Sequence, residues 1–243
     1  MSRIVNSPRI LAELLNRIPT TDTTAAPTLY LDMEGTKTCR HGTISIIELL
    51  IQGSSHVYLI DILTLGATAF TTPDRIGRTF GTILQSATLT KAFFDVRNNS
   101  DALFALYGIK LQGIVDIQLL ELAARPGDNK RYLKGLAKCI ELHCPMSRLE
   151  RADWVVTKIA GKRLFHPESG GSYAVFDERP LRSEIVKYCV QDVARLPDLW
   201  RVFEAGVSRE WRSRVVEATR ARVAESQSQG YVPNGPHKCF GPW

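Results

Sequence analysis

Two carboxylates separated by a single residue interrupt an apolar stretch near the start of the chain. Asp32 and Glu34 lie in residues 29–35, which read LYLDMEG. Residues two apart on a β-strand project from the same face, so this spacing predicts two carboxylates side by side. Paired acids on a largely apolar strand need a compensating cation, and oxygen ligands suit a hard divalent metal ion. The pair therefore indicates a metal site. The alternative is a strand that ends at Leu31 and leaves both acids in solvent.

A second pair of functional groups has the spacing of a helix face. Tyr188 and Asp192 stand at positions i and i+4 in a segment that Pro180 is expected to open as a helix. Side chains at this spacing share one helix face, so the phenol and the carboxylate point the same way. Taken alone, the pair is also typical of a half-buried tyrosine beside an exposed aspartate.

The order of strand and helix patterns predicts the framework that holds these groups. Residues 28–35, 43–51 and 56–63 are consecutive β-rich segments, and the last two are joined by a Gly-containing connection typical of a hairpin. Two further strands are expected, at 89–96 and at the start of 113–123. Helices are expected at 7–18, 73–87, 98–107, 131–142, 148–158, 180–203 and 208–225. This order predicts an α/β fold with a mixed five-stranded sheet flanked by helices, the ribonuclease H-like architecture.

Together the two pairs resemble the first and last motifs of the DEDD 3′–5′ exonucleases that carry a tyrosine, the DEDDy group of ribonuclease D and the Werner-type exonuclease domain. Other similar segments are KAFFDVRNNSDALFALYGI, YLKGLAKCI and RPLRSEIVKYCVQDV, in matching order over roughly residues 28–205. The closer likeness is to the exonuclease-domain proteins related to Egalitarian, especially those of fungi.

This resemblance implies a metal-dependent 3′–5′ exonuclease that acts on RNA or single-stranded DNA. It implies that Asp32, Glu34, Asp192 and a motif II aspartate hold two Mg²⁺ or Mn²⁺ ions. Such ions, ~4 Å apart, clamp the attacking and leaving oxygens of the phosphodiester. In the same family scheme, Tyr188 orients the attacking water or helps to deprotonate it.

The chain departs from the family pattern at motif II. The pattern has an aspartate nine residues before the glycine that ends the helix, and counting back from Gly108 reaches Asn99. Asparagine keeps an oxygen ligand but loses the charge. Asp101 or Asp95 is then an alternative source of the carboxylate, so we take Asn99 and Asp101 as candidate catalytic residues and Asp101 as a candidate metal ligand. The alternative function is a catalytically impaired nucleic-acid-binding or adaptor protein with the same fold.

Positive charge is concentrated in one segment of the chain. The formal net charge is +6 and the sequence pI is near 9.1. Residues 125–163 contain ten Lys or Arg and four Asp or Glu, so this segment alone carries the excess of the whole chain. Basic residues displace counterions from phosphates, which favours a nucleic-acid partner with Lys130, Arg131 and Lys134 as candidate contacts. The alternative is a solvated basic face.

Composition and length indicate a globular intracellular protein. The 243 residues are 44% hydrophobic and 23% charged, which excludes disordered and fibrous classes. No apolar run approaches the ~20 residues that a membrane helix needs, and the first residues lack the unbroken apolar stretch of a signal peptide. Five cysteines without a framework spacing fit reduced thiols. We therefore expect a nuclear or cytoplasmic protein that is not secreted and has no membrane partner.

Three parts are expected along the chain. Residues 1–27 are predicted to form an N-terminal helix and linker, 28–205 the exonuclease domain, and 206–243 an Arg-rich helix followed by a flexible tail.

Overall fold

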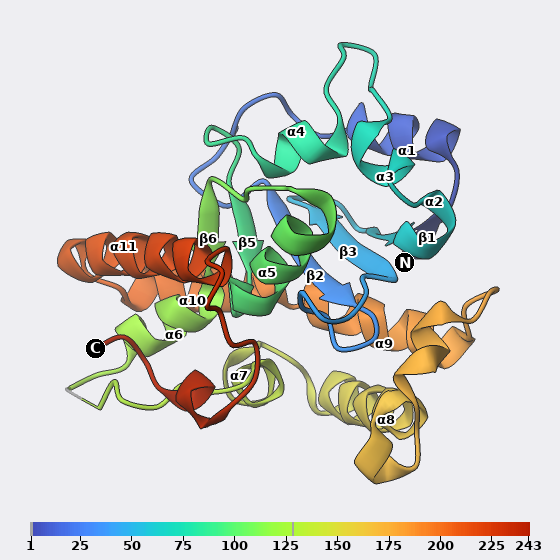
Figure 1. The fold of residues 1–243 in the computed structure, drawn as a ribbon. Helices are drawn as coiled ribbons and strands as arrows, with labels where there is room; N and C mark the ends of the chain where they lie inside the picture. The colour runs from blue at the N-terminus through green and yellow to red at the C-terminus, as the bar shows by residue number, and fades with distance from the viewer. Residues whose placement is uncertain (1, 128) are drawn as a thin grey trace.

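A single mixed sheet runs through the molecule (Figure 1). The structure, a computed structural model, describes residues 2–127 and 129–243. The strands are β1 (Ser2–Val5), β2 (Leu29–Glu34), β3 (Ile46–Ile51), β4 (Val57–Asp61), β5 (Lys91–Phe93) and β6 (Ile114–Asp116). Their order across the sheet is β1-β4-β3-β2-β5-β6. The two pairs made by β3 are antiparallel, and the other neighbouring pairs are parallel.

The predicted α/β class is confirmed, but the described sheet has six strands where five were expected. The additional strand is β1, which pairs in parallel with β4 from Ser2 opposite Val57 to Val5 opposite Ile60. Four residues are too few for a strand pattern to be read from the sequence, so only the long-range pairing with β4 defines β1.

Helices cover both faces of the sheet. One face carries α1 (Pro8–Leu15), α2 (Ile62–Leu65), α3 (Thr68–Thr71), α4 (Phe80–Leu84) and α5 (Val96–Tyr107). The other carries α6 (Ile117–Ala124), α7 (Leu136–His143), α8 (Arg148–Phe165), α9 (Ser183–Val193) and α10 (Leu196–Gly206). Helix α11 (Arg209–Ser226) packs on α5, α6 and β6, and short 3₁₀ turns occupy Pro167–Ser169, Tyr173–Asp177 and Pro236–Cys239. None of the described helices has the length and apolar character needed to cross a membrane.

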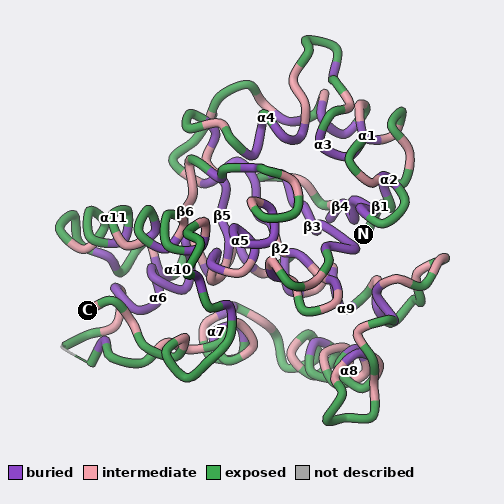
Figure 2. The backbone as a smooth tube through the Cα atoms, viewed as in Figure 1, coloured by how far each residue is buried: buried purple, intermediate pink, exposed green. Residues whose placement is uncertain are grey.

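Alternation along β2 divides its side chains between two hydrophobic cores. Leu29, Leu31 and Met33 belong to the core beneath α1 and α4, whereas Tyr30 belongs to the core beneath α9. Strands β3, β4 and β5 are buried along their whole length, whereas β1 at the edge of the sheet is largely exposed (Figure 2). By the same alternation, the two acids of β2 share one face, as the spacing predicted, and the structure shows that α9 packs on this face.

Several expected helices differ in extent from the observed ones. The helix expected over 131–142 is α7, which begins at Leu136, and the helix expected over 148–158 is α8, which continues to Phe165. Two further differences have identifiable reasons. The helix predicted over 73–87 is confined to α4, because the Asp74 carboxylate accepts hydrogen bonds from the backbone N–H groups of Ile76 and Arg78 and closes a turn there. The helix predicted over 180–203 is split into α9 and α10, with Pro197 in the first turn of α10. A proline fits a first helical turn but not a helix interior.

One carboxylate sets the start of α5, the helix that carries the motif II candidates. Asp116 accepts hydrogen bonds from the backbone N–H groups of Asp95 (3.0 Å) and Val96 (3.2 Å). It also caps α6 through the N–H of Gln118 and pairs with Arg222 at 2.6 Å. Since β5, β6 and α11 all meet at this group, the position of α5 depends on segments far apart in the chain.

Lys91 in β5 has an ionisable side chain buried in the protein, so its burial can be tested through the pH dependence of stability. Its side chain is fully buried, and Nζ donates to the Ser86 carbonyl oxygen at 2.5 Å. Burial lowers the pKa of Lys91 to about 7, although the Asp22 carboxylate opposes the shift. Above this pH the unfolded chain binds more protons than the folded chain, so this group makes stability rise with pH up to its unfolded pKa.

We expect Lys91→Met to remove this dependence. The stability of the variant relative to wild type should decrease as pH rises from about 7 to about 10, by up to ~1.4 kcal/mol per pH unit. Urea unfolding of both proteins at several pH values measures the difference. Lys110→Met, at an exposed position, serves as the control and should give a difference independent of pH. A pH-independent difference for Lys91→Met would contradict the expectation.

Candidate active site

The acids of β2 face a third acid on the neighbouring strand. Asp32 lies directly opposite Glu48 in the antiparallel register of β2 and β3. Directly opposed residues share a face, with Cβ atoms ~5 Å apart. Asp32 Oδ1 accepts hydrogen bonds from the backbone N–H of Met33 (2.9 Å) and from Asn99 Nδ2 (3.3 Å). Asp32, Glu34 and Glu48 therefore line one side of the sheet, with the amide of Asn99 beside them.

Helix α9 brings Tyr188 and Asp192 to the same side of the sheet. The helix packs on β2, β3 and β4, and both side chains are buried, 7% and 5% exposed. Asp192 Oδ2 forms an ion pair with Lys158 Nζ of α8. The same ammonium group lies 3.3 Å from the Tyr188 hydroxyl and 4.4 Å from the centre of its ring. The sequence predicted that Tyr188 and Asp192 share a face, but it did not indicate Lys158 as their partner.

A glycine allows α8 to approach Tyr188 this closely. A Cβ atom placed on Gly161 would lie 2.4 Å from Tyr188 Cδ2 and 2.7 Å from Cγ, so no larger residue fits without displacing the helices. The helix itself begins with a capping box, in which Ser147 and Glu150 satisfy each other's backbone N–H groups. Lys158 thus reaches Asp192 because the part of α8 around Gly161 packs directly against α9.

Glu48 is a site residue that the sequence reasoning missed. Its side chain is 1% exposed, and its Oε1 atom has no hydrogen-bond partner among the described residues. The available signal was a single acid inside the otherwise apolar strand segment 43–51. A buried carboxylate without a full set of partners is costly, which is the same argument that identified Asp32 and Glu34.

Burial raises the pKa values of all four carboxylates. It raises the pKa of Asp32 to about 6, against hydrogen bonds from Met33 and Asn99 that lower it. Burial, reinforced by the charge of Asp32, holds the pKa of Glu34 and Glu48 well above the usual range. Burial also raises the pKa of Asp192, although Lys158 opposes the shift. Four acids thus share one buried region in which, among the described residues, the ion pair of Lys158 with Asp192 is the one that a member of the cluster forms.

This donor set suits a hard divalent cation by its chemistry. The groups are oxygen ligands, and Asp192 Oδ1, like Glu48 Oε1, is buried without a hydrogen-bond partner of normal geometry. Within the described part of the chain, no three His, Cys, Asp or Glu side chains are already gathered as a chelating group. Lys158 occupies the Oδ2 atom of Asp192, so a metal ion at that atom would compete with the ammonium.

The three motif II candidates have separate environments. Asn99 is buried and faces Asp32, as described above. Both Asp101 oxygens are bonded to Arg40, Oδ1 to Nε at 2.6 Å and Oδ2 to the backbone N–H at 2.8 Å. Asp95 forms a two-point pair with Arg97. Asn99 is therefore the candidate that contacts the acid cluster, whereas Asp101, expected as a metal ligand, is engaged by Arg40.

The acid cluster opens on a cavity of about 520 Å³. Glu34 and Asn99 line it from β2 and α5, and Tyr173 and Asn234 line it from two later segments. Its dimensions suit a small polar ligand. An aromatic side chain such as Tyr173 at the wall offers a surface on which a base can stack.

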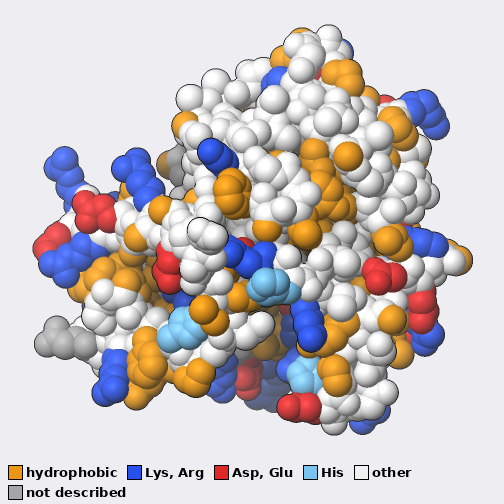
Figure 3. All heavy atoms as spheres, in the orientation of Figure 1, with side chains coloured by type: hydrophobic (Ala, Val, Ile, Leu, Met, Phe, Trp, Pro, Cys, Tyr) orange, Lys and Arg blue, Asp and Glu red, His pale blue; other side chains and the backbone are white. Residues whose placement is uncertain are grey.

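The three basic residues proposed as nucleic-acid contacts interact with other groups of the protein. Lys130 is buried, and its Nζ donates to the backbone carbonyls of Leu122, Ala123 and Arg125 at the C-terminal end of α6. Lys134 pairs with the buried Glu121 at 2.7 Å. The Arg131 guanidinium stacks on the Tyr132 and Phe240 rings. Figure 3 shows basic side chains scattered over one face of the molecule rather than gathered in a single patch. Lys130 in particular stabilises the fold and presents no free charge to a ligand.

Comparison with known families agrees with this geometry. A family model described as 3′-5′ exonuclease matches residues 3–205, most of the chain. The chain belongs to the 3′–5′ exonuclease family. The resemblance to the DEDD exonucleases drawn from the sequence motifs is thereby confirmed.

Solved structures and curated relatives extend the comparison. RNase D of Trypanosoma brucei, in complex with RNA U12, has a similar fold (20% identity, TM-score 0.73, covering 96% of this chain and 73% of that one). NrnC of Brucella melitensis with bound Mg²⁺ is also similar (17% identity, TM-score 0.54, covering 86% and 87%). The piRNA biogenesis protein EXD1 of Mus musculus is 34% identical over 94 residues, which is 39% of this chain and 15% of that protein. The matched region thus spans less than a fifth of the curated relatives' length.

We expect Lys158→Met to destabilise the protein strongly without divalent metal. Removing one partner of a buried ion pair leaves an uncompensated charge, which costs about 3–5 kcal/mol. Urea unfolding in the presence of EDTA measures the loss. Lys138→Met is the matched control, because it breaks an exposed pair with Glu141 and should cost less than ~1 kcal/mol. Equal losses for the two variants would show that Lys158 does not balance the acid cluster.

Proposed function

We propose that this protein is a metal-dependent 3′–5′ exonuclease that hydrolyses phosphodiester bonds at the 3′ end of RNA or single-stranded DNA. The observation that supports this best is the convergence of Asp32 and Glu34 from β2 with Tyr188 and Asp192 from α9. These are the residue types and the order of the family motifs, on the elements where the motifs require them. RNA is the preferred substrate, a choice supported by the RNA-bound RNase D of similar fold.

Asp32, Glu34 and Asp192 are the residues to which we assign metal binding, with Mg²⁺ or Mn²⁺ as the ions. When bound, two such ions supply Lewis-acid stabilisation of the attacking and leaving oxygens. The Tyr188 hydroxyl, buried at the edge of the acid cluster, orients the attacking water. Hydrophobic packing of α9 against β2 and β3 excludes other water from this wall and holds the phenol in place.

Lys158 is assigned two roles, one in the metal-free protein and one when metal is bound. In the metal-free protein its ammonium neutralises Asp192 and contacts Tyr188. The Asp192 carboxylate would favour a bound divalent ion over this ammonium, because the ion carries more charge. A lysine released in this way remains beside Tyr188 and the acid cluster, where it can neutralise a phosphate oxygen of the substrate.

Asn99 supports a second candidate function. The residue faces Asp32 in the place where the family pattern has an aspartate, and its amide donates a hydrogen bond to the Asp32 carboxylate. A site with one carboxylate fewer binds a second metal more weakly. A catalytically impaired nucleic-acid-binding or adaptor protein with the exonuclease fold is therefore the alternative.

The main test replaces Asp32. We expect Asp32→Asn to abolish 3′-end shortening of a 5′-labelled single strand in Mg²⁺ or Mn²⁺, and to remove the thermal shift that Mn²⁺ induces. Stability without metal should stay the same or increase, because one of several mutually repelling charges is lost. Asp153→Asn, at an exposed position of α8, is the matched control and should behave as wild type. An unchanged Mn²⁺-induced shift in Asp32→Asn would contradict the proposed site.

A second test separates enzyme from adaptor at Asn99. We expect Asn99→Asp to bind Mn²⁺ more tightly and to cleave faster, because the added carboxylate is attracted to a dication. Without metal it should be less stable, by about 1–3 kcal/mol, since the Asp32 hydrogen bond is lost and a like charge is added. Calorimetric titration and unfolding measure the two effects.

Gln112→Glu is the matched control for this test, because it adds the same charge at an exposed position between α5 and β6. The control should leave Mn²⁺ affinity nearly unchanged. Absence of cleavage by both wild type and Asn99→Asp in either metal would leave the adaptor as the function.

A further inference from the structure

The segment 228–243, expected to be a flexible tail, is fastened to the rest of the protein. The Tyr231 hydroxyl donates to Asn98 Oδ1 at 2.7 Å. Arg97 Nη2 donates to the Lys238 carbonyl oxygen at 3.0 Å, and the Gly241 N–H donates to the Arg131 carbonyl oxygen at 2.8 Å. These contacts hold the segment across the beginning of α5, next to the acid cluster.

Arg40 fixes the start of this segment to the same helix. Its guanidinium donates to the carbonyl oxygens of Ser226 (3.0 Å), Ser228 (2.7 Å) and Gln229 (3.1 Å) while Nε pairs with Asp101. The residue thus connects the end of α11 to α5. Asp101, a motif II candidate in the sequence, instead helps to hold the segment in place.

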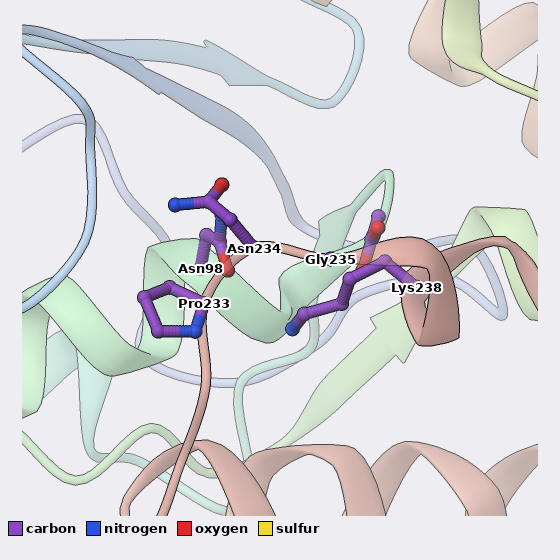
Figure 4. A pocket seen from close by; sticks show the side chains of 6 residues that line it. Asn98, Pro233, Asn234, Gly235 and Lys238 are labelled. Carbon is purple, nitrogen blue, oxygen red and sulfur yellow. The ribbon is translucent and has the colours of Figure 1, made fainter.

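A polar cavity of about 390 Å³ lies between the segment and α5 (Figure 4). It is lined by Asp95, Asn98, Pro233, Asn234, Gly235 and Lys238. In Figure 4 the two asparagine side chains lie close together, and the Lys238 side chain extends along the same opening. Asn98 and Asn234 also line the larger cavity that contains Glu34 and Asn99. The two cavities are therefore neighbours with a shared wall.

The charge of this second cavity favours an anion. Asp95 is neutralised by a two-point pair with Arg97, and Arg222 Nη1 lies 3.7 Å from Asp95 Oδ1. The Lys238 ammonium contacts the Tyr231 hydroxyl and ring, both uncharged, and forms no ion pair with any described carboxylate. Asn98 and Asn234 add amide groups able to donate hydrogen bonds. A phosphodiester oxygen is the anion that a cavity beside a nuclease site would meet.

We propose that Lys238 and Asn234 bind a phosphodiester group of the substrate strand, upstream of the nucleotide held in the larger cavity. This assignment rests on the proposed function, because it takes a nucleic-acid strand as the ligand. The segment 228–243 is then part of the substrate channel. A mononucleotide fills only the larger cavity and does not reach Lys238.

The test measures binding without catalysis. A 5′-labelled single-stranded RNA of about twelve nucleotides is titrated with the full chain in EDTA, and anisotropy is recorded at several salt concentrations. We expect Lys238→Ala to weaken binding roughly fivefold and to reduce the slope of log Kd against log salt by about 0.7, the value for one lost phosphate contact on a single strand. Asn234→Ala should weaken binding without changing the slope, and Lys238→Arg should retain the slope.

Lys110→Ala is the matched control, since it removes the same charge from an exposed position beyond the other end of α5. It should leave both Kd and slope unchanged, and thermal melting checks that every variant is folded. Affinity for a nucleoside 5′-monophosphate should be the same in wild type and Lys238→Ala.

Three results would overturn the assignment: an unchanged slope in Lys238→Ala, an equal effect of Lys110→Ala, or tighter binding by Lys238→Ala, which would make the segment a latch over the site. Because these titrations need no cleavage, a chain that binds as expected but never shortens RNA would contradict the proposed function and leave the phosphate site intact.

Discussion

The central physical constraint in this molecule is the concentration of carboxylates on one water-poor wall of the sheet. Asp32, Glu34 and Glu48 come from β2 and β3, and Asp192 comes from the helix packed above them. Their mutual repulsion in a region of low dielectric would disfavour the fold if nothing positive were close. Lys158 provides that charge in the metal-free state. The close contact of α8 with α9, and the glycine that permits it, are both required for this balance.

Helix α5 connects the acid cluster to the rest of the protein through successive side chains. Asn99 bonds to the central carboxylate, Asn98 bonds to Tyr231 of the last segment, and Asp101 bonds to Arg40. Neighbouring residues of one helix point in different directions, ~100° apart, so each reaches a different partner. A change in the position of α5 would therefore alter the acid cluster and the polar cavity beside it together. Asp116, which caps the start of the helix, limits such movement.

Several basic residues in this chain bond to the protein itself and thereby stabilise the fold. Lys130 satisfies carbonyl groups at the C-terminal end of α6. Arg78 donates to the carbonyl oxygens of Leu15, the last residue of α1, and of Ile18 and Pro19 beyond it. A positive net charge indicates that a polyanion is attracted to the protein, but it does not identify the side chains that are available to bind it. In this structure, Lys238, which lies outside the most basic segment, is better placed than Lys130 to meet a phosphate.

The sequence by itself determined the features that depend on local periodicity. Strand alternation placed Asp32 and Glu34 on one face, the helical repeat aligned Tyr188 with Asp192, and the order of elements predicted the fold class. Only the tertiary structure decided which partners these groups meet. Glu48 lies opposite Asp32 because of the register between β2 and β3. Lys158 contacts Asp192 because α8 packs against α9. Asn99 contacts Asp32 while Asp101 is bonded to Arg40, and this difference depends on where the loop carrying Arg40 lies. A local pattern defines a side chain's direction relative to its own element, whereas its neighbours depend on packing between residues far apart in the chain.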